Sequence, residues 1–87
     1  MIELFSDTDR TLYYEGCRYQ EITPEETRAL PEDTEVYVAE LQDGRINEVS
    51  RYVTGLRFKR PVLYKEPFRN LFVNIGSFST RMYLQKA

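Results

Sequence analysis

Short connections between apolar segments constrain the fold of this chain more than any other feature. Breaks such as Gly16, Asp43-Gly44 and Pro61 separate these segments by only a few residues. A crossover between parallel strands needs about a dozen residues or more, so neighbouring strands are expected to run antiparallel. A chain of 87 residues also has room for one modest core. We therefore predict an α+β fold: one small domain over 1–87, with a mainly antiparallel sheet of four to six strands and one to three short helices.

The first third of the chain predicts a hairpin followed by a short helix. Two tyrosine-rich runs flank Glu15-Gly16, which predicts a hairpin over 11–22 because glycine can adopt the positive φ of a tight turn. Thr23 can then cap a helix, with Pro24 in its first position and Glu26 completing a capping box. Pro31 excludes α geometry from the residue before it, so this helix should end near position 30.

The middle of the chain predicts a strand over 35–41 and leaves the next segment open. Ile46, Val49, Val53 and Leu56 recur at helical spacing, so 46–55 can be read as a helix. The Asp43-Gly44 turn signal favours a returning strand instead. In that hairpin Leu41 would face Ile46, and Val38 would face Val49.

The last third predicts two strands and a short helix. Residues 56–64 alternate in polarity, which places Leu56, Phe58, Val62 and Tyr64 on one face of a single strand. Pro61 has no backbone donor, so this strand should be bulged or lie at a sheet edge. Residues 67–76 fit a short helix that starts at proline and ends at glycine, with a strand over 68–73 as the alternative. A strand over 78–84 follows, with Phe78, Thr80, Met82 and Leu84 on one face.

The charges of this chain are strongly segregated along the sequence. Residues 1–48 hold 13 acids and 4 bases, a charge of −9, whereas residues 49–87 hold 1 acid and 8 bases, a charge of +7; together they give the net −2. Such asymmetry between halves points to a charged partner, such as nucleic acid or another protein. It can also be satisfied internally, by opposite charges on neighbouring strands, or by a homodimer in which unlike faces meet.

Several function classes are disfavoured by what the sequence lacks. It contains no histidine, which removes the commonest general acid–base and metal ligand. Its one cysteine, Cys17, cannot form an intrachain disulfide, and beside tyrosines it reads as a small buried apolar residue. No signal peptide or long apolar run is present. We expect a cytoplasmic, non-enzymatic protein with no cofactor, no metal and no membrane contact.

Two segments are candidates for binding. Acids cluster over 21–40, and they would meet the basic surface of a protein partner or simply form a solvated helix start and loop: Glu21, Glu25, Glu26, Glu32, Asp33, Glu35 and Glu40. Bases interleave with aromatics over 51–83, a mixture suited to single-stranded nucleic acid unless the aromatics form the core: Arg51, Arg57, Lys59, Arg60, Lys65, Arg69 and Arg81. We predict a regulator or inhibitor that binds a basic protein through the acidic segment, with nucleic-acid binding as the alternative.

Overall fold

The computed structural model describes residues 4–6, 10–43, 45–66, 71–75 and 81–87. These residues form eight strands and one helix: β1 (Leu4–Ser6), β2 (Thr11–Tyr14), β3 (Cys17–Ile22), α1 (Pro24–Arg28), β4 (Glu35–Gln42), β5 (Arg45–Arg57), β6 (Arg60–Lys65), β7 (Phe72–Asn74) and β8 (Arg81–Lys86). The fold is therefore richer in strands than predicted and nearly all-β, with one short helix in the described part of the chain.

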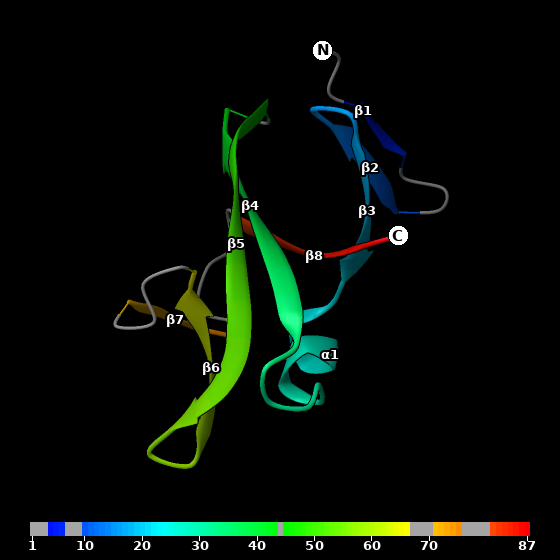
Figure 1. Cartoon of the computed structure of the whole chain (residues 1–87). Coiled ribbons are helices and arrows are strands. Elements are labelled where there is room, and N and C mark those ends of the chain that lie inside the picture. Colours follow the sequence, from blue (N-terminus) through cyan, green and yellow to red (C-terminus); the bar gives the residue numbers. More distant parts are fainter. Residues whose placement is uncertain (1–3, 7–9, 44, 67–70, 76–80) are drawn as a thin grey trace.

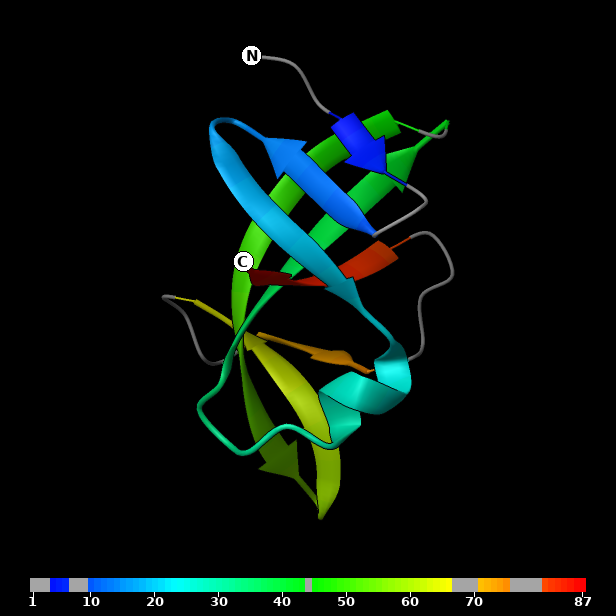
Figure 2. The same cartoon turned by 90° about the vertical axis from the view of Figure 1, so that its right-hand side faces the viewer.

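All eight strands belong to one antiparallel sheet. Their order is β1-β2-β3-β8-β4-β5-β6-β7, so two meanders are joined by the last strand of the chain. Figure 1 shows β1–β3 on one side of the molecule, β4–β7 on the other, and β8 passing between them. The same arrangement is seen from the side in Figure 2. The predicted antiparallel sheet is confirmed, as the short connections require.

The central strands are buried on both faces. Alternate residues of β4 enter two different apolar clusters: Val36 and Val38 the first, Tyr37 and Ala39 the second. The first cluster also holds Tyr52, Leu63, Ile75 and Tyr83. The second also holds Leu12, Tyr19 and Leu84. Side chains alternate along a strand, so the two clusters lie on opposite faces of β4 and β8. Strands β5 and β6 supply buried residues on one face, and β2 and β3 supply them on the other.

Helix α1 starts as its sequence predicts. The Thr23 hydroxyl accepts the backbone N–H of Glu26 at 3.1 Å, and the Glu26 carboxylate accepts the backbone N–H of Thr23 at 2.8 Å. This reciprocal capping box confirms the predicted start, and the helix stops at Arg28, before Pro31. Within the described residues no helix is long and apolar enough to cross a membrane.

The two hairpins with glycine turn signals are confirmed. β2 pairs with β3 around Glu15-Gly16, and β4 pairs with β5 beyond Asp43. Segment 46–55 is therefore a strand. Leu41 faces Ile46 as predicted, but the register shifts between Glu40 and Leu41, so Val49 faces Ala39 rather than Val38. A β-bulge, which adds one residue on one strand, cannot be deduced from the turn alone and accounts for this error.

The predicted single strand over 56–64 is wrong. The chain turns back at Phe58-Lys59, and Arg57 pairs with Arg60. Leu56 thus lies opposite Pro61 and shares a face with it, while Val62 and Tyr64 point to the other face. β6 lies between β5 and β7 and is not an edge strand, but β7 pairs only with Val62–Tyr64, so Pro61 lies beyond it.

The predicted helix over 67–76 is also corrected where it is described. Residues 72–74 form strand β7, in which Val73 pairs with Leu63 and Phe72 with Tyr64. Val73 packs against the first cluster, so tertiary contact overrides the helical spacing. Residues 67–70 and 76–80 lie outside the described residues. β8 starts at Arg81, and Met82 and Leu84 both face the second cluster, as the alternation predicts.

Candidate functional site

The acidic segment over 21–40 is largely occupied by contacts within the fold. Four of its seven acids form ion pairs with arginine: Glu21 with Arg10, Glu25 with Arg28 at 4.0 Å, Glu35 with Arg51 at 2.8 Å, and Glu40 with Arg81 at 3.6 Å. Glu26 closes the capping box. The remaining two, Glu32 and Asp33, line an open hollow of about 270 Å³ beside Thr54, Gly55, Leu56 and Tyr64. Binding of a basic partner through this segment stays a prediction.

Glu35 accepts two hydrogen bonds from side chains of β4 and β5. Its carboxylate accepts a hydrogen bond of 2.6 Å from the Tyr37 hydroxyl and one of 2.8 Å from Nε of Arg51. The Tyr37 bond, and then the Arg51 contact, lower the pKa of the Glu35 carboxyl below its usual value. Burial and the neighbouring carboxylate raise the pKa of Tyr37. The pair joins the acidic first half to the basic second half, so part of the charge segregation is neutralised inside the sheet.

Replacing Glu35 with glutamine should make the protein less stable at neutral pH but not in acid. Because the folded pKa of Glu35 is lowered, its contribution is present above the unfolded value of about 4.3 and is lost as pH falls through the folded value. Since both partners are partly exposed, we expect about 0.2–1 kcal/mol at pH 7.

Urea unfolding of the wild type and the Glu35→Gln variant across acid and neutral pH measures this difference. Glu32→Gln removes the same charge from an exposed loop residue and serves as the control. A Glu35→Gln deficit that persists undiminished in acid would contradict the role of the ionised carboxylate.

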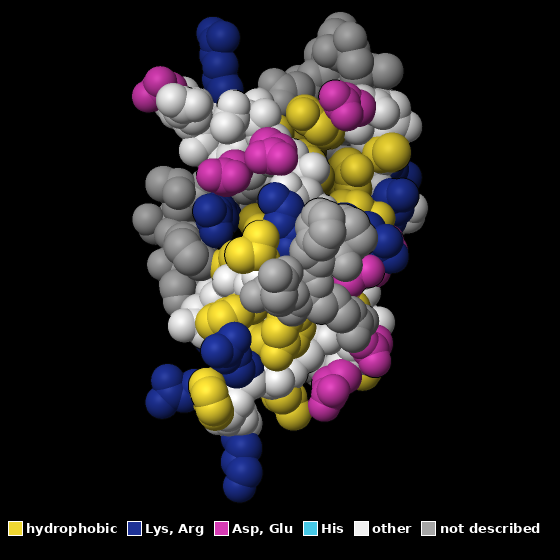
Figure 3. All heavy atoms as spheres, turned by 60° about the vertical axis from the view of Figure 1, so that its left-hand side comes forward, with side chains coloured by type: hydrophobic (Ala, Val, Ile, Leu, Met, Phe, Trp, Pro, Cys, Tyr) yellow, Lys and Arg dark blue, Asp and Glu magenta, His cyan; other side chains and the backbone are white. Residues whose placement is uncertain are grey.

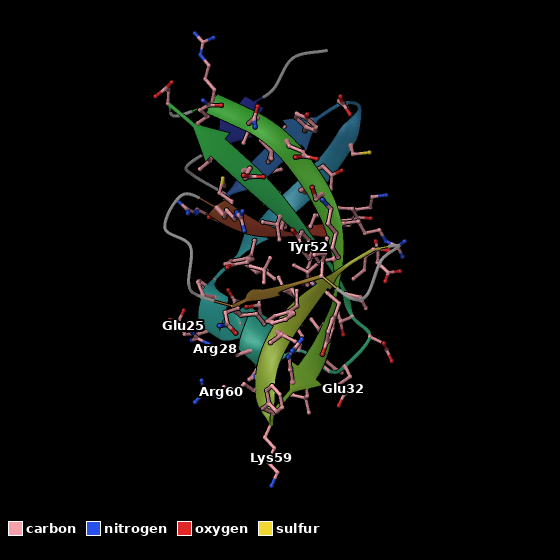
Figure 4. All side chains as sticks on the ribbon, turned by 90° about the vertical axis from the view of Figure 1, so that its left-hand side faces the viewer. Glu25, Arg28, Glu32, Tyr52, Lys59 and Arg60 are labelled. Carbon is pink, nitrogen blue, oxygen red and sulfur yellow. The ribbon has the colours of Figure 1, made fainter. Side chains whose placement is uncertain are left out.

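The structure brings together three of the seven predicted bases. Arg57, Lys59 and Arg60 are all exposed at the β5–β6 turn. In Figure 4 Lys59 points away from the molecule at the tip of this hairpin, and Arg60 lies close to it. Arg51 and Arg81 are ion-paired elsewhere, Lys65 is half-buried, and Arg69 lies outside the described residues.

The turn itself has an unusual composition. Phe58 and Lys59 have φ of 52° and 61°, the left-handed values that a two-residue type I′ turn requires at both positions. Asparagine and glycine are the usual residues there, and other residues cost about 1–2 kcal/mol each. Burial does not offset this cost, because Phe58 is 85% exposed. The alternative in which the aromatics of 51–83 form the core is therefore wrong for Phe58.

An aromatic row continues from this turn along one face of the hairpin. Val53, Tyr64 and Phe72 are paired across β5, β6 and β7, and Arg57 and Arg60 point to the same face. The ring centroids of Tyr64 and Phe72 are 6.4 Å apart. The Arg57 guanidinium carbon lies 4.2 Å from the centroid of Phe72 and 5.4 Å from that of Phe58. Both distances fall within the range of cation–π attraction.

We call this surface the basic–aromatic face; it consists of Arg57, Phe58, Lys59, Arg60, Tyr64 and Phe72. Two of the five large apolar side chains that are exposed among the described residues belong to it, Phe58 and Phe72. Figure 3 shows hydrophobic side chains between Lys and Arg side chains at the lower end of the molecule. Tyr52 and Tyr83, which also belong to the predicted aromatic segment, are buried in the first cluster instead.

The ring of Tyr64 packs directly over Gly55 within this face. A Cβ atom on Gly55 would lie 2.4 Å from Cε2 of the Tyr64 ring, so the ring lies directly over the glycine. The Tyr64 hydroxyl donates a 3.0 Å hydrogen bond to the carbonyl of Leu56, which fixes the ring at its far end. A glycine inside a strand often marks such a close approach.

Gly55→Ala should therefore have opposite effects in two backgrounds. In the wild type the new methyl group displaces Tyr64, and the lost hydrogen bond costs about 0.5–1.5 kcal/mol. In a Tyr64→Ala background the clash is absent, and the substitution should stabilise by about 0.5–1 kcal/mol because alanine suits a strand better than glycine. A double-mutant cycle by urea unfolding measures this coupling. Equal effects in both backgrounds would show that Tyr64 does not lie against Gly55.

Sequence reasoning found the cations of this face but missed its geometry. The turn at Phe58-Lys59, which brings Arg57 and Arg60 onto the face of Tyr64, was not recognised. The available signal was Arg60, which breaks the alternation of 56–64 by placing a charge on an apolar face. The chain matches no protein-family model, and no significant match exists among curated proteins or solved structures.

Proposed function

We propose that this protein is a non-enzymatic nucleic-acid-binding protein that binds single strands through the basic–aromatic face. The observation that carries the proposal is the Arg57 guanidinium held 4.2 Å from the Phe72 ring, beside two further exposed cations. Cations neutralise phosphates, and aromatic faces stack on unpaired bases. Single-strand binding requires both groups on one exposed surface, and this hairpin supplies them together.

The distribution of charge around the face supports a polyanion as its ligand. Arg57, Lys59 and Arg60 would repel the same face of a second copy, which argues against self-association there. Tyr64 also lines the hollow that holds Glu32 and Asp33. These acids would repel phosphates, so a bound strand should follow the side of the hairpin that carries Arg57 and Phe72.

Affinity for a short labelled single strand, measured by fluorescence anisotropy at increasing salt, tests the proposal. Three phosphate contacts predict a slope of about −2 in log K against log salt. Affinity should then fall about 20-fold between about 50 mM and 200 mM salt. Absence of binding at the lower salt, or a flat dependence, would contradict the proposal.

A matched variant separates this proposal from the alternative acidic site. Glu25→Gln combined with Glu32→Gln removes two acids of the 21–40 segment, both exposed and neither needed for the capping box. If a strand binds the basic–aromatic face, this variant should bind it as tightly as the wild type or more tightly, because repulsion decreases. A marked loss of strand affinity would place the binding surface elsewhere.

A further inference from the structure

The basic–aromatic face presents aromatic rings in two different places. Phe58 lies at the very end of the β5–β6 hairpin, in the turn. Phe72 and Tyr64 lie on the side of the same ribbon, paired across β6 and β7. The Arg57 guanidinium connects them, since it lies within 5.4 Å of the Phe58 centroid and 4.2 Å of the Phe72 centroid. A ring at the end and a ring on the side can each contact a base, but in different directions.

We infer that the preferred ligand is a junction between a duplex and a single strand, an inference that rests on the proposed function. Phe58 stacks on the last base pair of the duplex. The strand that leaves the duplex then follows Arg57, Phe72 and Tyr64 along the side of the ribbon. Lys59 and Arg60, next to Phe58 in the chain, meet the phosphates on either side of the duplex end.

The chemistry of a duplex end fits an exposed ring at a hairpin tip. Inside a duplex each base pair is covered by its neighbours, so no flat face is open to Phe58. At a junction the last pair exposes one face, and stacking of an aromatic ring on a base is favourable for any sequence. Cations beside the ring suit this position, because phosphates flank the terminal pair on both strands.

The strained backbone of the turn supports a role for Phe58 in ligand binding and not in stabilising the fold. A two-residue type I′ turn forms most readily with asparagine and glycine. This chain places phenylalanine and lysine there, both at positive φ, and Phe58 remains 85% exposed. Backbone strain that the fold does not offset is commonly stored at functional positions. The turn therefore holds the Phe58 side chain out in solvent, where it can contact a ligand.

An anionic membrane is the other surface that a phenylalanine among cations could meet. Membrane insertion would require the apolar groups to project together. Here Phe72 and Tyr64 lie along the side of the ribbon, away from the turn, and Arg57 lies against Phe72. The row of rings behind the tip is explained by a strand that continues along the hairpin, and not by insertion of the tip alone.

The test compares three labelled DNA probes with the full chain: a single strand, a blunt hairpin duplex, and the same duplex carrying a single-stranded tail of either polarity. The wild type should bind one tailed duplex about 5- to 150-fold more tightly than the single strand, the range expected for one stacked base. Phe58→Ala should abolish this gain, so that the variant binds the tailed duplex no more tightly than it binds the single strand. Leu71→Ala, at another exposed apolar residue, is the control and should keep the gain.

The outcomes separate the inference from the proposed function. Equal affinity for the tailed duplex and the single strand, or a gain that survives in Phe58→Ala, overturns the junction and leaves single-strand binding intact. No binding of the single strand overturns the proposed function and the inference with it. Binding to anionic phospholipid vesicles that depends on Phe58, without any junction gain, overturns the inference in favour of a membrane. Circular dichroism of each variant verifies that it is folded.

Discussion

Replacing Lys59 and Arg60 together with glutamine should lower the affinity of the protein for single-stranded DNA about 25-fold at 0.1 M salt. Each phosphate contact to a single strand contributes about 0.7 to the slope of log K against log salt. Two lost contacts reduce that slope by about 1.4, and relative to a 1 M reference the affinity at 0.1 M falls by about 1.4 log units. Both side chains are exposed, so folding should be unaffected. Anisotropy titrations at several salt concentrations measure both quantities.

The matched control removes two exposed arginines from other parts of the sheet. Arg18 lies on β3 and Arg45 starts β5 at the opposite end of that long strand. Arg18→Gln combined with Arg45→Gln changes the net charge by the same amount. This variant should keep most of the affinity, because binding depends on where the cations lie and not on total charge. If both double variants lost the same affinity, binding would depend only on total charge. That result would contradict binding at a defined face.

Leu84→Ala should destabilise the protein by about 2–5 kcal/mol, the range for a buried leucine whose removal leaves a cavity. Leu84 is 0% exposed and belongs to the second cluster. It lies on β8, where it pairs with Glu21 of β3 on one side and Tyr37 of β4 on the other. Small domains have a total stability of about 5–15 kcal/mol, so this one substitution removes a large share of it.

The unfolding curve of this variant also tests the connection between the two meanders. If β8 couples β1–β3 to β4–β7, Leu84→Ala should lower the midpoint of urea unfolding and keep a single transition. Leu84→Met, which conserves volume, should cost less than about 1.5 kcal/mol. Leu71→Ala, at an exposed position, should stay within about 0.5 kcal/mol of the wild type. A small loss at Leu84 would mean that β8 is not central to the sheet.

Local signals in the sequence were sufficient for the elements that depend on neighbouring residues. The capping box at Thr23 and the hairpin of β4 and β5 form as predicted, because each is decided by a few adjacent residues. The turn at Phe58-Lys59 carries no such signal, since neither residue prefers positive φ. Missing it merged β5 and β6 into one strand and reversed the face on which Leu56 lies relative to Tyr64.

The candidate site was harder to predict because it depends on register. Arg81 lies directly opposite Glu40, and Arg51 reaches Glu35, only because β4 pairs with β8 on one side and β5 on the other. Composition identified these residues as charged but could not indicate which ones neutralise each other. Arg57, Lys59 and Arg60 lie together because the chain turns back between β5 and β6, and the sequence carries no signal for that turn.

The most direct test of the basic–aromatic face is a two-dimensional amide NMR titration of the labelled protein with a short single strand. The amides of residues 57–60, with those of Tyr64 and Phe72, should shift most strongly, and the shifts should weaken as salt is raised. Unchanged spectra at low salt, or shifts confined to the acidic loop around Glu32, would contradict the account.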